Sequence, residues 1–493
     1  MSEKNSSYNQ VLKATSIFGG VQFFGMIISI IKSKCIAVLL GAHGMGVISL
    51  LNATVDLISE FIKVGLDTSA VKSLAYAKMN TNENEIQHII GVLQKLLLIS
   101  GFFGVILMVS LSPVLSKLVF ENDTYVNAFI CISVALLFKQ LSIGQLSVFQ
   151  GLRKMNYLAK ISLFSNLIGL CIAVPMYYFY GTKAIVPVII ANAFVVFIIG
   201  KYFFNKAKIK SIKKTYSEAF VEGKQMLKLG GMISLKGGIT LLTLYVLQLY
   251  IGHFGGVKEL GLYSAGFVII NSYVGLIFNA MQMDYFPRLS EVVNNKVQLR
   301  KVVQEQSFIA ILIVTPIIVL FIIAVPYIIQ ILYTKEFLGI LDLVTWAILG
   351  TLFKTVSWTI GYVLIAKGDS KLFMKTTLFF NTLLLIMTIL GYYLGGLLGV
   401  GISFFIYYII HFIVLRIITQ LKYELYFDKK FIQAFGVSIL FCLSVFLSVL
   451  IKGDIVKYIT MFSLLLLSLT YSIYHLDKNT GVLSKLIKLL RKK

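Results

Sequence analysis

Long runs of apolar residues, separated by short polar segments, fill the chain from about residue 15 to residue 475. The run from Ile309 to Val325 is typical, because it contains no charged residue. Runs of this length suit helices that cross about 30 Å of hydrocarbon. They lack the polar–apolar alternation, over about ten residues, of a membrane β-barrel strand. The pattern therefore predicts an all-α polytopic membrane protein of about fourteen spans, at approximately 15–40, 45–66, 88–112, 125–149, 157–179, 184–204, 229–252, 261–283, 306–331, 341–365, 372–391, 397–416, 431–451 and 456–475.

The chain repeats itself at a constant offset of 215 residues. Leu-Phe-Lys-x-x-Ser occurs at Lys139 and again at Lys354. Gly41, Gly46 and Ser49 match Gly256, Gly261 and Ser264 at the same offset, as Lys160, Phe164 and Asn166 match Lys375, Phe379 and Asn381. We expect two pseudo-symmetric six-helix bundles of like orientation, the arrangement of parallel repeats in transporters. The predicted parts are a bundle at 1–204, a cytoplasmic linker at 205–228, a bundle at 229–420, and two extra helices with a basic tail at 421–493.

The positive charge lies mainly on one side of the predicted membrane. Of the 45 Lys and Arg residues, 32 fall in alternate connections beginning with the N-terminus, six in the opposite connections, and seven within spans. Because cytoplasmic connections carry the excess of Lys and Arg, we expect both termini in the cytoplasm. This distribution explains most of the net charge of +24 without a nucleic-acid partner. Attraction to anionic membrane lipid is the further consequence.

The composition and the absence of known motifs limit the kinds of site that the chain can contain. The chain is 58% hydrophobic and 13% charged, with a mean hydropathy of +0.87. The four cysteines are unpaired in spacing and fall within spans, and the histidines are scattered. No metal cluster, nucleophile motif, phosphate loop or dinucleotide motif is found, so we expect no metal, no cofactor and no catalytic residue. The many Phe and Tyr residues are attributed to helix packing and membrane interfaces rather than to an aromatic box.

The candidate site consists of cations at membrane depth. A Lys near the bilayer centre costs about 2.5–3.5 kcal/mol and is by default a functional hypothesis. Lys139 and Lys354 lie mid-span in both repeats, and Lys32 and Lys236 are the next candidates for a cavity that binds anions. The acids Asp56 and Glu60 are candidates for ion coupling, although Glu60 could instead pair locally with Lys63. Residues on polar helical stripes, expected to line the cavity or to join helices by hydrogen bonds, are Gln22, Ser29, Asn52, Asn271 and Asn279.

Three local patterns carry a family resemblance. They are the Leu40-Gly41-x4-Gly46-x2-Ser49 turn, the Gly-Leu-Asp-Thr-Ser run from Gly65 to Ser69, and the Gly-Leu-Arg-Lys-x-x-Tyr connection from Gly151 to Tyr157. With the span count, they resemble the lipid-linked oligosaccharide and O-antigen flippases of the multidrug/oligosaccharidyl-lipid/polysaccharide (MOP) exporter superfamily. The resemblance implies a MATE-like fold, and ion coupling in at least some relatives.

The resemblance also implies a function. A polyprenyl-diphosphate-linked oligosaccharide would be flipped across the bacterial inner membrane by alternating access, with membrane lipids as surroundings and polysaccharide polymerase and chain-length machinery as partners. A cationic cavity suits the anionic diphosphate of such a lipid. No bond is made or broken, so the protein would not be an enzyme. The alternatives are an ion-coupled multidrug exporter of the same superfamily, which would need acids in the cavity, and a membrane-embedded polymerase or transferase, which would need a larger external loop.

Overall fold

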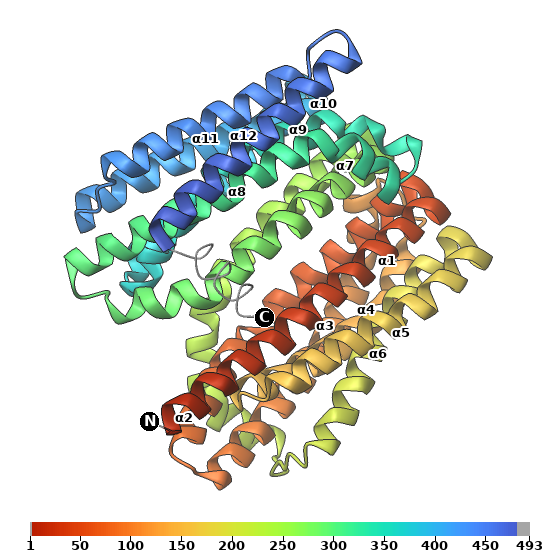
Figure 1. Ribbon diagram of the computed structural model, residues 1–493. Helices are drawn as coiled ribbons and strands as arrows, with labels where there is room; N and C mark the ends of the chain where they lie inside the picture. Colours follow the sequence, from red (N-terminus) through yellow and green to blue (C-terminus); the bar gives the residue numbers. More distant parts are fainter. Residues whose placement is uncertain (1, 481–493) are drawn as a thin grey trace. The chain divides into compact units, whose positions relative to one another are not determined.

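Helices account for almost all of the computed structural model (Figure 1). The structure describes the backbone of residues 2–480, and the side chains of residues 24–478 except positions 26, 229, 232, 233, 236, 272–274, 276, 277, 279, 280, 282 and 283. The helices are α1 (Ser2–Lys63), α2 (Leu66–Met79), α3 (Glu83–Phe120), α4 (Val126–Gly151), α5 (Met155–Tyr180), η1 (Gly181–Ala184), α6 (Ile185–Lys206), α7 (Tyr216–Glu291), α8 (Lys296–Leu332), η2 (Lys335–Ile340), α9 (Leu341–Ala366), α10 (Ser370–Tyr423), α11 (Lys429–Ser448) and α12 (Asp454–Thr480).

Three of the helices are interrupted by glycine. Gly41 in α1 has φ 66° and Gly256 in α7 has φ 80°, in the region that side chains rarely adopt. In α10 the break lies at Gly395 and Gly396. Each interrupted helix is therefore two membrane segments joined by a tight turn, since 54 to 76 residues of straight helix would far exceed the bilayer.

The predicted number of spans follows from these breaks. Ten stretches of the described residues are long and apolar enough to cross a membrane. When the three interrupted helices are each counted twice, the eleven long helices α1 and α3–α12 give fourteen membrane segments in residues 2–480. The all-α polytopic prediction is thus confirmed, and α2, with 14 residues, is too short to cross.

The chain forms two compact units, which we describe separately. Unit 1 comprises residues 1–264 and 332–336, and unit 2 comprises 265–331 and 337–493. In unit 1, an apolar core joins α2, α3, α4, α6 and the start of α7 through fully buried side chains such as Leu74, Leu93 and Phe149. The division of the sequence into two six-helix bundles, a linker and two extra helices remains a prediction.

In unit 2, α9 packs along α10. Gly350 of α9 lies so close to α10 that an added Cβ would be 3.1 Å from the Cα of Phe405. In the most apolar stretch of Lys335–Ala366, 61% of the residues are buried, against 17% in Asp454–Lys478. The last helix therefore adds little to the core of unit 2.

A pair of glycines joins α1 to α7 reciprocally within unit 1. A Cβ added to Gly46 would lie 2.9 Å from the carbonyl carbon of Val257, and a Cβ added to Gly261 would lie 2.8 Å from the carbonyl carbon of Ala42. At the offset of 215, Gly46 corresponds to Gly261 and Ala42 corresponds to Val257. The contact of Gly46 with Val257 and the contact of Gly261 with Ala42 are therefore equivalent in the two repeats. This is the geometry of a local two-fold axis, which supports the repeat.

The matched serines lie at this axis. Ser49 Oγ and Ser264 Oγ share a hydrogen bond of 2.8 Å, in which either can donate. A residue that contacts its own counterpart must lie on or near the two-fold axis. We name the contact formed by Ala42, Gly46, Ser49 and Val257, Gly261, Ser264 the glycine seam.

Candidate functional site

Lys139 is not a free cation in unit 1. Its Nζ donates to the carboxylate of Asp56, which joins α4 to the second segment of α1. The lysine side chain is 31% exposed and the aspartate 51%, so the pair is accessible rather than sealed in the core. The sequence places the two residues in separate roles, as substrate cation and coupling acid, whereas the structure makes them one ion pair.

Gln140, the residue after Lys139, fixes the contact between Lys139 and Asp56. Gln140, which is fully buried, donates from Nε2 to both the backbone oxygen and the Oγ of Ser59, each at 3.0 Å. A buried amide with two acceptors on the facing helix sets the position of α4 against α1. Lys139 is thereby held opposite Asp56.

Glu60 has its own cation. Lys63 Nζ lies 2.7 Å from Glu60 and 2.8 Å from Asp67, so the local pairing considered from the sequence is present. Ser234 of α7 donates to the backbone oxygen of Glu60 at 3.1 Å. Both candidate coupling acids are therefore paired with lysine in this structure.

Lys354 has different surroundings in unit 2. Its Nζ lies 5.9 Å from the ring centres of Phe278 and Phe404 and 5.4 Å from that of Tyr408. The side chain is half-buried, and among the described residues no carboxylate forms an ion pair with it. Aromatic faces attract a cation but accept no strong hydrogen bond, so the three N–H donors of Lys354 stay available to an anion.

The repeat explains why the two lysines differ. At the offset of 215, Asp56 corresponds to Asn271 and Glu60 to Gly275. The second repeat therefore has no acid at either position. Asn271 is exposed, and nothing lies within 4 Å of a Cβ added to Gly275. Lys354 lacks the partner that Lys139 has because the chain supplies none at the equivalent place.

A second polar group lies beside Lys354. The ring centre of His411 in α10 lies 4.0 Å from that of Phe380, with the two planes tilted, and 5.8 Å from that of Tyr408. Its Nδ1 is buried without a hydrogen-bond partner in the described part of the chain. Lys354, Tyr408 and His411 thus form one polar patch within an otherwise aromatic region of unit 2.

The remaining candidates are less informative. Lys32 is half-buried with no ion pair among the described residues, while Ser29 is exposed and Asn52 half-buried. The structure shows no common partner for these three. The side chains of Gln22, Lys236 and Asn279 lie outside the described residues.

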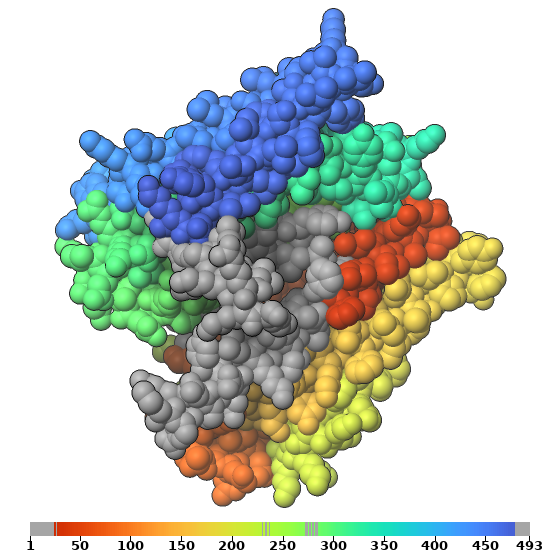
Figure 2. Space-filling model, in the orientation of Figure 1, coloured from red at the N-terminus to blue at the C-terminus, as the bar shows by residue number. Residues whose placement is uncertain are grey.

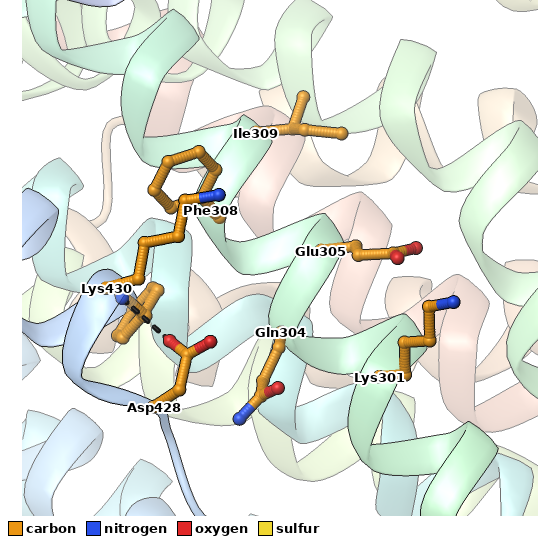
Figure 3. Close-up of a pocket in the computed structure, with 8 residues that line it drawn as sticks. Lys301, Gln304, Glu305, Phe308, Ile309, Asp428 and Lys430 are labelled. Carbon is orange, nitrogen blue, oxygen red and sulfur yellow. Dashed lines mark hydrogen bonds between the residues drawn. The ribbon is translucent and has the colours of Figure 1, made fainter. Parts of the chain in front are cut away.

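A charged pocket of unit 2 differs from the surroundings of Lys354, because it contains acids as well as lysines (Figure 3). It has a volume of about 390 Å³ between the starts of α8 and α11. Its two lysines, Lys301 and Lys430, are matched by Glu305 and Asp428. Asp428 also caps α11 by accepting from the backbone N–H of Phe431 at 2.8 Å. With balanced charge, this pocket does not select anions.

The connection before α7 is fixed to α3. Thr215 and Glu218 form a reciprocal capping box that starts α7 at Tyr216. Farther along, Glu222 contacts Lys214 at 2.9 Å and His88 of α3 at 3.0 Å. The hydrogen bond from Lys214, assisted by His88, holds the pKa of Glu222 below its ordinary value. Within residues 205–228, α6 ends at Lys206 and α7 begins at Tyr216, and the whole segment belongs to unit 1.

Two features of the site escaped the sequence analysis. The Asp56–Lys139 pair could have been inferred, because an acid and a lysine at similar depth on neighbouring helices lower each other's cost. The aromatic rings around Lys354 were not singled out from the sequence. The sequence indicates this aromatic group through Phe404 and Tyr408, which lie four residues apart and therefore on one face of a helix.

Comparison with solved structures defines the fold. A multidrug resistance MATE family transporter of the MOP superfamily, inward-facing, superposes with a TM-score of 0.68 at 11% identity, covering 83% of this chain and 98% of that one. The lipid II flippase MurJ, inward closed, gives 0.68 at 15% identity, covering 93% and 99%. A MOP superfamily transporter from Pyrococcus furiosus gives 0.56 at 13%, covering 84% and 96%. The protein is a multi-pass membrane protein with the fold of these solved transporters and of this flippase.

The family follows from the sequence itself. The chain belongs to the family described as polysaccharide biosynthesis protein, which matches residues 35–342, more than half of its length. A comparison with curated proteins finds no match. The family and the fold confirm the resemblance to MOP-type polysaccharide flippases.

Proposed function

We propose that the protein flips a polyprenyl-diphosphate-linked oligosaccharide, an O-antigen or other surface polysaccharide repeat unit, from the cytoplasmic to the outer leaflet. Transport proceeds by alternating access through a cationic cavity. The protein resides in the bacterial inner membrane with both termini in the cytoplasm, and it acts as a translocase rather than an enzyme. Polysaccharide polymerase and chain-length machinery are its expected partners.

The observation that carries this proposal is the uncompensated Lys354. A half-buried ammonium that forms no ion pair with any carboxylate in the described part of the chain, and that lies among aromatic rings, is suited to an anionic ligand. The ring faces reduce the cost of the charge while no substrate is present. A diphosphate would then supply the strong acceptors that the rings cannot. Lys32 and Lys236 are the further cations that we propose for the head group, with Gln22, Ser29, Asn52, Asn271 and Asn279 as polar lining.

Lys139 has a conditional role in the proposal. While Asp56 is ionised, Lys139 is held in the ion pair and is not available to the substrate. Protonation of Asp56 would remove its negative charge and leave Lys139 available to the substrate. Asp56 is our preferred coupling group, ahead of Glu60, because its partner Lys139 is a candidate substrate cation, whereas Lys63, the partner of Glu60, is not. If coupling operates this way, collapse of a proton gradient slows flipping in wild-type liposomes but not in Asp56→Asn liposomes.

The proposed substrate is tested by reconstitution. The full-length protein in liposomes is offered a fluorescent polyprenyl-diphosphate sugar, and separately a cationic dye typical of multidrug exporters. We expect movement of the lipid-linked sugar and no transport of the dye. Dye transport without sugar flipping would favour the exporter alternative, and release of new glycosidic product would favour a polymerase or transferase.

A further inference from the structure

Helices α5 and α6 form a groove on the surface of unit 1. They are joined by the short η1 turn and pack side by side, and in Figure 2 their yellow atoms form part of the surface of unit 1. The groove has a volume of about 510 Å³. Lys160 and Phe164 of α5, and Tyr202 and Lys206 of α6, are among its lining residues.

The groove is apolar along its length and cationic at one end. Phe164, Ile198 and Tyr202 are 45%, 43% and 57% exposed, so the apolar wall is open. Lys160 is in the second turn of α5 and Lys206 is the last residue of α6. Because the two helices are antiparallel neighbours, both lysines lie at the same end, which the distribution of Lys and Arg predicts to be cytoplasmic.

The charge at this end is not balanced. The lining residues include no acid, and within residues 24–478 neither lysine forms an ion pair. The Lys206 ammonium lies 5.7 Å from the ring centre of Tyr202, which leaves its N–H donors available. A basic pocket between membrane helices on the cytoplasmic side suits an anionic lipid head group.

We propose that this groove is a binding site for an anionic diacylphospholipid of the inner leaflet. Its phosphate contacts Lys160 and Lys206, and an acyl chain lies along Phe164, Ile198 and Tyr202. The site is separate in chemistry from the proposed head-group cations, since it presents an open apolar wall and its two lysines lie in the second turn of α5 and at the last residue of α6. It does not depend on the flippase proposal.

The second repeat provides an internal control. Lys160 corresponds to Lys375, which is also exposed, but Lys206 corresponds to Leu421. The next residue, Lys422, is held by the carboxylate of Asp369. The equivalent place in unit 2 therefore lacks the pair of uncompensated lysines.

The test compares lipid binding by the full-length protein in neutral detergent, using native mass spectrometry. Wild-type protein is titrated with phosphatidylglycerol and with phosphatidylcholine, alongside Lys160→Gln/Lys206→Gln and the control Lys375→Gln. With each lysine contributing about fivefold, we expect the double variant to bind phosphatidylglycerol about 25-fold more weakly. Phosphatidylcholine binding stays unchanged, and Lys375→Gln behaves as wild type. Size-exclusion profiles check that the variants are folded, and exposed Lys→Gln changes should preserve them.

Three results would overturn the proposal. One is equal affinity of wild-type protein for the two phospholipids. Another is an equal loss in Lys375→Gln, which would mean diffuse surface charge rather than a site. The third is a preference for polyprenyl phosphate over phosphatidylglycerol that the double variant abolishes, which would assign the groove to the carrier lipid.

Discussion

The glycine seam predicts that two substitutions 215 residues apart have the same effect. Gly46→Ala and Gly261→Ala each place a methyl group against a backbone carbonyl of the other helix, at 2.9 and 2.8 Å from the carbonyl carbon. Real Cβ atoms essentially never approach another heavy atom within 3.0 Å. Since the obstacle is backbone and not a flexible side chain, α1 and α7 must separate locally.

The size of the effect follows from two opposing terms. Overpacking costs typically about 1–3 kcal/mol, and the backbone obstacle places these sites at the upper end. The gain in helix propensity from Gly to Ala is at most about 1 kcal/mol. We therefore expect a net loss of about 2 kcal/mol for each variant, and values within about 0.5 kcal/mol of each other because the two environments are reciprocal.

The assay is SDS-induced unfolding in mixed micelles, with Gly436→Ala as the matched control. Gly436 lies within α11, and nothing is found within 4 Å of an added Cβ there. The control should be neutral or more stable than wild type. A seam variant as stable as this control, or two seam variants that differ by more than about 1.5 kcal/mol, would refute the reciprocal packing.

Three further predictions concern other parts of the chain. In a double-mutant cycle on Lys139→Gln and Asp56→Asn, we expect a coupling of about 1 kcal/mol, as for a partly exposed pair; additive losses in SDS unfolding would deny that the pair stabilises the protein. The folded-state pKa of Glu222 is depressed, so its contribution is full above its ordinary pKa of 4.5 and is lost as pH falls through the lower folded value. The hydrogen-exchange protection of residues 209–228, taken relative to the intrinsic exchange rate at each pH, should therefore fall in that acid range, and Glu222→Gln should be less protected at neutral pH as well. Protection that does not change with pH and is equal in both proteins would contradict this. Gly256→Ala should destabilise by about 1 kcal/mol or more, because φ 80° strains any residue with a Cβ, and thermal stability equal to wild type would exclude that strain.

Much of the fold could be predicted from the sequence because its signals are local. Apolar runs of spanning length define the helices, and glycine at matched positions identifies the turns at Gly41 and Gly256. The offset of 215 relates those turns without any knowledge of contacts. The packing that produces the seam was not predictable, because composition cannot show which glycine faces which backbone.

The candidate site was harder to predict, because charge compensation depends on neighbours distant in sequence. Lys139 and Lys354 have the same local motif, yet one is paired with Asp56 and the other is enclosed by aromatic rings. The difference arises 83 residues away from Lys139 in the sequence, where an acid in one repeat is Asn271 in the other. A comparison of Asp56 with Asn271, its counterpart in the second repeat, would have revealed this difference between the two lysines.

Flipping of a lipid-linked sugar by Lys354 variants tests the central claim most directly. Purified wild-type, Lys354→Ala and Lys354→Arg proteins, reconstituted at equal amounts, are assayed for movement of a fluorescent polyprenyl-diphosphate sugar between leaflets. Loss of a charge-assisted contact of about 1.5–3 kcal/mol predicts a rate at least about tenfold lower for Lys354→Ala, with substantial activity kept by Lys354→Arg. A wild-type rate in folded Lys354→Ala protein would contradict recognition of the anionic head group by this lysine.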